Sequence, residues 1–278
     1  MKPVISIVIP HKNSSNTVEK LVDTIPNVPE IEVIVVDDKS YPEEFILLLK
    51  LRDKRSNLVV IQNEDEESNA GIARNIGLSH VNGQWVLFAD SDDEFLDNAF
   101  DVFFKTASDY RDSDVVLFRC RSLDEVRNPS SRAEKVNSLI ECYPDNIDTI
   151  LYEWLVPWGK LIKFDLIEDN KLRFDSCLAS NDVMFSTKLA AHAKNVSVIN
   201  VEVYCCFLRV GSLTSSIDED KALSRLSVLV SRNKYLSNKD VKIRRDVGFT
   251  YFKKSKPWKL NREKLGIYFA WFWQLVSK

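Results

Sequence analysis

Short runs of consecutive apolar residues alternate with amphipathic segments along the first hundred residues of the chain. The apolar runs lie at residues 6–9, 31–36, 58–62 and 85–89. They lack a period-two alternation, which is typical of strands buried on both faces. The segments with helical spacing lie at about residues 14–22, 43–52 and 70–80. Strand and helix therefore alternate, and this order predicts a parallel sheet with crossover helices.

The pattern is less regular after residue 98. A helix is expected at 99–108 and a strand at 115–120, and a polar stretch at 124–137 predicts an exposed loop. Helical spacing returns at about 145–155, 183–193 and 222–235, and residues 196–207 favour one or two strands. We find no internal repeat.

Acidic residues follow two of the predicted strands. Asp37 and Asp38 follow the second, and the sequence Asp90-Ser91-Asp92-Asp93 follows the fourth. Because parallel strands end at a common edge, where open α/β sheets bind ligands, these acids are expected to face one crevice. Clustered carboxylates raise one another's pKa unless a cation neutralises them, and Mg²⁺ or Mn²⁺ accepts such oxygen ligands. A solvated acidic loop that caps the next helix is the alternative.

Composition argues against several classes of protein. The 278 residues are 45% hydrophobic and 28% charged, as in ordinary globular domains. No apolar run reaches the roughly 18 residues that span a membrane, and the first run, Val4 to Ile9, is too short for a signal peptide. The five cysteines are scattered, which argues against a disulfide framework or a zinc site and fits a reducing cytosol. The loop from Pro10 to Asn13 lacks a glycine-rich signature, which weakens a dinucleotide-dehydrogenase interpretation.

The net charge of −3 is unevenly distributed. From Lys239 onward eleven basic and three acidic residues give this tail a charge of +8, against −11 for the rest. The tail also contains an aromatic-rich segment, Trp258 to Val276. Basic, aromatic helices are typical of segments that lie in the headgroup region of an anionic leaflet. Docking of the segment on the rest of the chain or on another subunit is the alternative.

Seven segments of the chain, taken in order, resemble the bacterial family 2 glycosyltransferases, which have the GT-A fold. They are SIVIPHKN (6–13), VIVVDDKS (33–40), NAGIARNIGL (69–78), WVLFADSDD (85–93), PWGKLIK (157–163), SNDVMF (180–185) and FLRVGSLTSS (207–216). The resemblance implies an α/β fold with a Rossmann-like, mostly parallel central sheet, flanking helices and a C-terminal helical extension. It implies a catalytic domain at 1–216, divided into a nucleotide-sugar-binding half (1–97) and an acceptor-binding half (98–216). A helical region, 217–278, would follow, with 256–278 as its basic aromatic amphipathic segment.

The resemblance also implies roles for individual residues on the donor side. The residues expected to bind the nucleotide sugar are Pro10, Asn13, Asp38, Arg74, Asp90, Ser91 and Asp92. Asp38, with Asp37 as a weaker candidate, would accept the N3–H of uracil, a charge-assisted bond. Asp92 would hold Mn²⁺ or Mg²⁺, with Asp93 sharing that task, and Arg209 and Ser212 would belong to a loop that closes over the diphosphate. A turn at the two aspartates and a surface position for Arg74 are the alternatives.

On the acceptor side, the resemblance implies that Asp182 is the general base on the acceptor hydroxyl. Trp158, Lys160 and Asn181 match elements that lie near the acceptor. The family commonly has Glu-Asp where this chain has Asn181-Asp182, which puts in doubt any acceptor contact made by the glutamate. Asp182 could instead cap the following helix, and Trp158 could equally be a core residue. Lys12 and Lys39 are departures around the base pocket.

The resulting hypothesis is an inverting, metal-dependent glycosyltransferase that moves a hexose from a UDP-sugar to a hydroxyl of a glycan. The acceptor would be linked to a polyprenyl diphosphate in the synthesis of a surface polysaccharide such as O-antigen or capsule. We expect a cytoplasmic, peripheral protein at the inner face of the cell membrane, without a nucleic-acid partner and with oligomerisation left open. A nucleotidyltransferase is one alternative, although PHKN (10–13) is not its glycine-rich signature. A non-catalytic, membrane-associated sugar-binding relative is the other, and the intact acids Asp38, Asp90, Asp92 and Asp182 argue against it.

Overall fold

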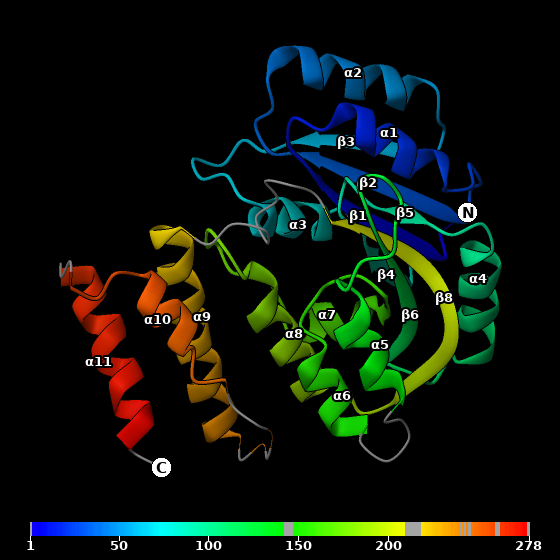
Figure 1. Ribbon diagram of the computed structural model, residues 1–278. Helices are drawn as coiled ribbons and strands as arrows, with labels where there is room; N and C mark the ends of the chain where they lie inside the picture. The colour runs from blue at the N-terminus through cyan, green and yellow to red at the C-terminus, as the bar shows by residue number, and fades with distance from the viewer. Residues whose placement is uncertain are drawn as a thin grey trace.

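An eight-stranded mixed sheet forms the centre of the molecule (Figure 1). The computed structural model describes residues 2–141, 147–208, 218–239, 241, 243, 246–258 and 262–276. The strands are β1 (Ile5–His11), β2 (Ile31–Asp37), β3 (Leu58–Gln62), β4 (Trp85–Phe88), β5 (Glu94–Phe95), β6 (Val115–Asp124), β7 (Lys160–Lys163) and β8 (Val196–Leu208). Their order in the sheet is β3-β2-β1-β4-β7-β6-β8-β5.

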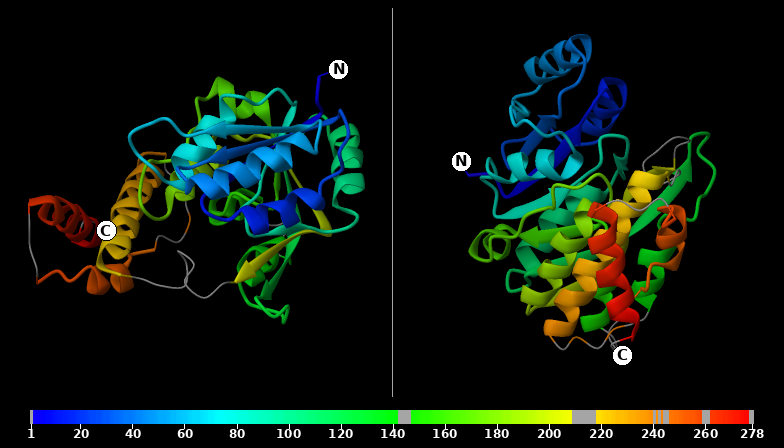
Figure 2. Two further views of the ribbon diagram at one scale, coloured as in Figure 1. Left: turned by 90° about the horizontal axis from the view of Figure 1, so that it is seen from above. Right: turned by 90° about the vertical axis from the view of Figure 1, so that its left-hand side faces the viewer.

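The first four strands are parallel and are joined by three helices, as the hydrophobic pattern predicts. These helices are α1 (Ser15–Asp23), α2 (Pro42–Asp53) and α3 (Ala70–Leu78). The chain runs outward from β1 to β3 and then crosses back to β4, so right-handed connections place α1 and α2 on one face and α3 on the other (Figures 1 and 2). The apolar runs of β1, β2 and β4 are buried because both faces of the sheet are covered, whereas the edge strand β3 is only partly buried.

The register aligns the carboxyl ends of these strands at one edge. His11 at the end of β1 pairs with Asp37 at the end of β2, and Asp37 pairs with Gln62 of β3. On the other side of β1, Val8 pairs with Phe88 at the end of β4. The strand order reverses between β1 and β4, which is the switch point where open α/β sheets leave a ligand crevice.

The second half of the chain extends the same sheet. β7 pairs antiparallel with β4 and with β6, and β8 runs parallel to β6. The accompanying helices are α4 (Ala99–Asp109), α5 (Glu134–Glu141), α6 (Ile147–Glu153), α7 (Phe164–Asp169) and α8 (Asn181–His192). The expected halves 1–97 and 98–216 thus share one continuous sheet.

The polar stretch at 124–137 is not a simple exposed loop. β6 continues to Asp124, and α5 begins at Glu134. The side chain of Asn137 hydrogen-bonds both the amide and the carbonyl of Cys120, at 3.0 and 2.7 Å. The side chain of Asn137 thus pairs with the backbone of β6 in the way that a neighbouring strand would. Because this contact is polar, the hydropathy pattern alone indicated a loop.

Three helices follow the sheet; the first stands beside α8, and the other two pack on the first (Figures 1 and 2). They are α9 (Glu219–Asn238), α10 (Phe249–Lys254) and α11 (Arg262–Val276). Val228 of α9 packs against Val183 and Met184 of α8, and Tyr268 and Trp271 of α11 form a separate small core with α9. Within the described ranges, no helix has both the length and the apolar character required to cross a membrane.

Candidate active site

The first part of the candidate site is the junction between the ends of β1 and β2. His11 Nδ1 lies 3.1 Å from Asp37 Oδ1, and the amide of Ser14 donates to His11 Nε2 at 3.2 Å. Because Nε2 accepts this bond, Nδ1 carries the proton and donates to Asp37. Burial raises the pKa of Asp37, but hydrogen bonds from His11 and Ser40 outweigh it and hold the pKa below its usual value. Asp37 is therefore an ionised acid that fixes the two strand ends.

Asp38, the expected uracil acceptor, is held by the loop that follows β3. Its Oδ1 accepts from Asn63 Nδ2 at 2.6 Å, and its Oδ2 accepts from Ser68 Oγ at 2.9 Å. The residue is buried. A carboxylate oxygen has two lone pairs, so each oxygen can accept one further donor. The carboxylate is positioned before any nucleotide binds, and its contact with a base stays a prediction.

Pro10 and Asn13 shape the loop after β1. Pro10 is the buried partner of Val36 in the sheet. Asn13 has a φ of 51°, a left-handed conformation that asparagine tolerates, and its Oδ1 accepts from the amide of Tyr41 at 2.8 Å. Asn13 therefore ties the loop after β1 to the loop after β2.

The two lysines that depart from the family pattern hold the loop after β3. Lys12 Nζ donates to Ser68 Oγ at 2.6 Å, and Lys39 Nζ donates to the carbonyl of Glu66 at 2.9 Å. Both lysines thus join the loops after β1 and β2 to the loop after β3.

Arg74 connects the acidic turn to the start of α8. Its Nη2 donates to Asp90 Oδ1 at 2.6 Å, and its Nη1 donates to Asn181 Oδ1 at 3.0 Å. The guanidinium carbon lies 5.3 Å from the ring centroid of Phe174. The side chain is buried, so the alternative of a surface arginine is wrong. The donor-side and acceptor-side segments meet at this residue.

The local structure of α3 explains this meeting point. Asn69 caps the helix, because its Oδ1 accepts from the amides of Gly71 and Ile72 at 2.9 and 3.0 Å. A Cβ atom on Gly71 would lie 2.3 Å from the carbonyl oxygen of Asp175. Glycine at this position therefore lets the segment before α8 cross the first turn of α3.

Asp93 points into the protein. Its Oδ2 accepts from Tyr204 Oη and its Oδ1 accepts from the amide of Phe207, both at 2.8 Å. Burial, together with the charges of Asp90 and Asp92, raises the pKa of Asp93 well above its usual value. The hydroxyl oxygen of Tyr204 also accepts from the amide of Asp90 at 2.9 Å. These contacts favour a structural role for Asp93, which joins the acidic turn to β8, over the metal-ligand role that the sequence suggested.

Arg132 reaches the same turn from the segment before α5. Its Nη2 lies 3.6 Å from Asp90 Oδ2, and its Nη1 donates to the carbonyl of Phe207 at 2.7 Å. Burial lowers the pKa of Arg132, but Asp93 and Asp90 outweigh it and raise the pKa. Sequence reasoning missed this residue, because it lies in a polar stretch without periodicity. Ser91 lies on the same turn, and its hydroxyl oxygen is 3.0 Å from the hydroxyl oxygen of Ser14.

The acidic turn carries the residues to which the resemblance assigns a divalent cation. In the part of the chain that the structure describes, no group of three or more His, Cys, Asp or Glu side chains could hold an ion by itself. Asp93 is buried in the protein, whereas Asp92 is half-exposed. Mg²⁺ is commonly bound by one or two carboxylates with phosphate oxygens and water, and carboxylates also suit Mn²⁺. A single carboxylate is therefore an adequate protein contribution.

Asp182 occupies the first turn of α8, beside the Arg74–Asn181 contact. Ser180 is in the N-cap position and the helix begins at Asn181, so Asp182 is not the cap. Burial raises the pKa of Asp182, and the charge of Asp90 raises it further. The charges of Arg74 and Lys160 lower this pKa but do not outweigh burial, so it lies above the usual value. An aspartate with a raised pKa is suited to accept a proton.

Trp158 and Lys160 lie beneath the site and do not face an acceptor. Trp158 is 1% exposed and stacks on Tyr204 at a centroid distance of 6.0 Å. Lys160 is equally buried, and its Nζ donates to the carbonyl of Trp154 at 2.7 Å and to Ser186 Oγ at 3.1 Å. Burial lowers the pKa of Lys160 to about 7. Both side chains are therefore packed inside the protein, and neither has a face available to a sugar. Arg209 and Ser212 lie outside the described residues.

Comparison with known proteins places this geometry in context. Over 199 residues the chain is 30% identical to a poly(ribitol-phosphate) beta-glucosyltransferase of Bacillus spizizenii, covering 70% of this chain and 30% of that protein. Over 224 residues it is 28% identical to the glycosyltransferase GlyA of Streptococcus pneumoniae, covering 76% and 31%. The chain thus spans about a third of the length of these relatives.

Solved structures share the fold. The crystal structure of S. aureus TarS 1–349 aligns with a TM-score of 0.69 at 21% identity, covering 99% of this chain and 81% of that one. The expected GT-A fold is therefore confirmed, with a mixed sheet, flanking helices and C-terminal helices. Residues 6–173 match the model of the family described as Glycosyl transferase family 2, and the chain belongs to that family.

Proposed function

We propose that the chain is an inverting, metal-dependent glycosyltransferase that moves a hexose from a UDP-sugar to a hydroxyl group of a glycan. One observation carries this proposal. Arg74 hydrogen-bonds both Asp90 of the acidic turn and Asn181 at the start of α8, so the acidic turn lies beside the helix turn that carries Asp182. Asp90 follows β4, next to the switch point of the sheet, where ligands bind in this class of fold.

The residues divide the reaction between them. Asp38 binds the nucleotide base, and Arg74 holds Asp90 in place near the ribose and diphosphate. Asp182 accepts the proton of the acceptor hydroxyl while the hydroxyl oxygen forms a bond to the anomeric carbon of the sugar. The bond between that carbon and the UDP oxygen breaks on the opposite face. The cation held by Asp92 would neutralise charge on the departing diphosphate.

The departure at Asn181 has a structural explanation. A glutamate at this position would bring a second carboxylate to Arg74, whereas Asn181 offers a neutral oxygen at 3.0 Å. Arg74 thus keeps a single strong ionic partner, Asp90, at 2.6 Å. We infer that the asparagine preserves the connection between the two sides and that Asp182 alone supplies the base.

The acceptor that we propose is a surface polymer or its lipid-linked precursor. Relatives are named for transfer to poly(ribitol-phosphate), and one is named for transfer to an undecaprenol-diphosphate-linked glycan. A peripheral position at an anionic cytoplasmic membrane surface fits such an acceptor. Several large apolar side chains of α11 are exposed, which supports this position.

A donor screen tests the proposed function. UDP-Glc, UDP-Gal, UDP-GlcNAc and UDP-GalNAc are each incubated with the protein and Mn²⁺, and UDP release is followed with and without EDTA. We expect release from at least one donor, lost with EDTA and lost in Asp92→Asn, with the folded state of the variant checked by circular dichroism. Metal-independent release that survives Asp92→Asn would overturn the proposal.

A further inference from the structure

Helix α11 carries two separate apolar stripes. Tyr268 and Trp271 are buried against α9 and α10. The second stripe consists of mostly exposed residues: Leu265, Phe269, Phe272, Trp273 and Val276. Their spacing of four, three, one and three residues places them on one face of the helix. The docked stripe fixes α11 on the protein, so the exposed stripe is free to meet a partner of its own.

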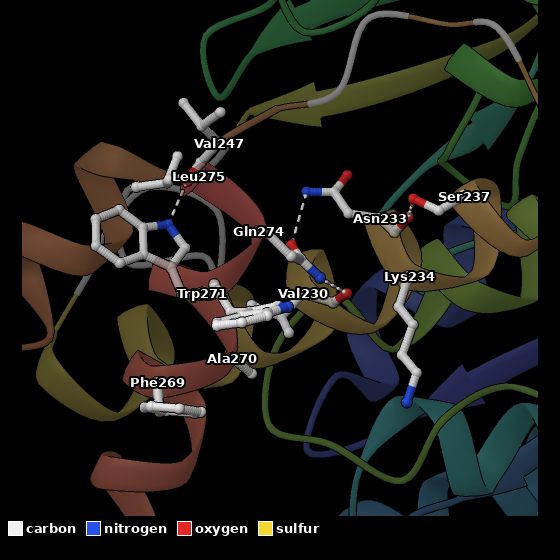
Figure 3. A pocket seen from close by; sticks show the side chains of 11 residues that line it. Val230, Asn233, Lys234, Ser237, Val247, Phe269, Ala270, Trp271, Gln274 and Leu275 are labelled. Carbon is white, nitrogen blue, oxygen red and sulfur yellow. Dashed lines mark hydrogen bonds between the residues drawn. The ribbon is translucent and has the colours of Figure 1, made fainter. Parts of the chain in front are cut away.

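A pocket adjoins the exposed stripe, between α9 and α11 (Figure 3). It has a volume of about 630 Å³, within the range of about 300–1,000 Å³ typical of ligand pockets. Val230 and Trp271 contribute apolar walls, and Ala270 leaves space because its side chain is small. Phe269 and Trp273 line the pocket and are 71% and 63% exposed, so the pocket reaches the surface beside the stripe.

The wall of the pocket also contains polar groups. Asn233 is buried, and its Nδ2 donates to the carbonyl of Asp246 at 2.9 Å and to Gln274 Oε1 at 3.4 Å (Figure 3). Its Oδ1 has no hydrogen-bond partner among the residues that the structure describes. Lys234 lines the pocket as well and is exposed. An apolar chain with a negatively charged, hydroxyl-bearing head therefore matches the pocket chemically.

Charge distinguishes a lipid surface from a second copy of the chain. Lys234 lines the pocket, and Lys253 and Lys254 lie exposed on α10, whose Phe252 stacks on Trp271 of α11 at 4.1 Å. The chain from Lys239 onward carries a net charge of +8. Two copies that met through this face would bring like charges together, whereas an anionic bilayer complements them.

We propose that the pocket between α9 and α11 binds one acyl chain of an anionic phospholipid while the exposed stripe lies among the headgroups. The proposal rests on the peripheral membrane position proposed above and names the site that accounts for it. The stripe supplies area and the pocket supplies selectivity for a lipid whose phosphate reaches Lys234.

Co-sedimentation with vesicles tests this proposal. The full chain is mixed with phosphatidylglycerol vesicles and with phosphatidylcholine vesicles, without a sugar donor. Wild type should pellet with the first and not with the second. Lys234→Gln should bind about fivefold more weakly, since a lysine at an anionic surface contributes about that factor. Lys239→Gln has the same change in charge but does not line the pocket, and it should bind more tightly than Lys234→Gln.

Filling the pocket separates chain binding from adsorption of the stripe. Ala270→Leu places a larger side chain in the pocket and leaves the exposed stripe unchanged. We expect it to reduce quenching of tryptophan fluorescence by phosphatidylglycerol with a nitroxide-labelled acyl chain, while Phe272→Ser, on the exposed stripe but outside the pocket lining, weakens pelleting. Quenching that is unchanged in Ala270→Leu would overturn the pocket as the chain site. Concentration-dependent self-association that Phe272→Ser abolishes, with no vesicle binding, would assign the face to a second copy. UDP binding measured on each variant shows separately whether the sugar-transfer site is intact.

Discussion

Arg74 illustrates what single residues contribute to this site. Its two terminal nitrogens donate to side chains from different parts of the chain, Asp90 and Asn181, and the planar guanidinium sets the angle between them. Lysine carries the same charge but cannot form two such directed bonds.

Substituting Arg74 with lysine should therefore reduce catalysis without unfolding the protein. We expect kcat/KM for the sugar donor to fall by about tenfold to a hundredfold, because a hydrogen bond to a charged group contributes about 1.5–3 kcal/mol. Steady-state kinetics and a thermal melt measure both effects. Wild-type kcat/KM in Arg74→Lys would show that the connection between the two sides has no role in turnover.

The buried charge of Lys160 should influence the pH profile. Its charge is among the causes that lower the pKa of Asp182, opposing the larger effect of burial. A base must be deprotonated to act, so kcat/KM rises with pH through the pKa of Asp182. In Lys160→Met that pKa rises, and the acidic limb of the profile should move to higher pH.

Lys163→Met provides the matched control for this prediction. Lys163 lies on the same strand, but its Nζ lies over the ring of Trp85, and its charge is not among the causes that shift the pKa of Asp182. Its acidic limb should coincide with that of wild type. An unshifted limb in Lys160→Met would mean that the lysine acts only as packing.

Sequence reasoning located the acids that follow β2 and β4 but not the orientations of their side chains. The acids of the motif after β4 are distinguishable only by their partners, and Asp93 faces inward because Tyr204 and Phe207, more than a hundred residues later, donate to it. The burial of Trp158 and Lys160 likewise depends on β8 and α8, which no local pattern reveals.

At the scale of elements, α9 braces the helix that carries Asp182. Arg232 is buried, and its Nε donates to Thr187 Oγ1 at 3.2 Å while its Nη2 donates to the carbonyl of Tyr152 at 2.9 Å. Ser224 and the backbone of Ala179 exchange two hydrogen bonds at 3.1 Å. These bonds tie α9 to α8 and to the segment before it.

Arg232→Ala should destabilise the protein. Two acceptors would lose their donor and a cavity would form, so we expect the free energy of unfolding to fall by about 2–3 kcal/mol. Urea titration followed by circular dichroism measures this change. Arg173→Ala is the control: its pair with Glu168 is exposed, and its loss should cost about 1 kcal/mol or less. Equal losses in the two variants would contradict the bracing role.

Elements in the regular first part of the chain were predicted to within a few residues. The expected helix at 14–22 is α1 (Ser15–Asp23), which buries Val18, Leu21 and Val22, and the expected strand at 58–62 is β3. By contrast, α5 was missed: it buries Val136 and Ile140, but it is only 8 residues long and follows a polar stretch. Arg132, which lies in that stretch, was missed with it.

At the scale of the whole molecule, docking and membrane contact of the C-terminal segment are compatible. The sequence presented them as alternatives because one helix shows an aromatic-rich pattern on more than one face. In the structure one stripe of α11 is buried on α9 and α10 and the other is exposed. The parallel direction of the first four strands followed from the alternation of patterns, whereas their order in the sheet and the pairing of β7 and β8 depend on contacts distant in sequence.

Salt should weaken binding to an anionic surface. The Debye length falls from about 10 Å at 0.1 M to about 3 Å at 1 M salt, so attraction by the basic tail is screened while apolar burial is not. Vesicle pelleting at these two concentrations should show a clear loss of affinity for phosphatidylglycerol. Affinity that is independent of salt would show that charge does not contribute.

The central claim is that Asp182 removes the acceptor proton in a crevice whose other residues bind the donor. The most direct test compares Asp182→Asn with wild type in sugar transfer and in calorimetric binding of UDP with Mn²⁺. We predict that transfer falls by about 10²- to 10⁴-fold, the usual contribution of a general base, while UDP affinity is unchanged. Transfer at the wild-type rate in Asp182→Asn would contradict the account.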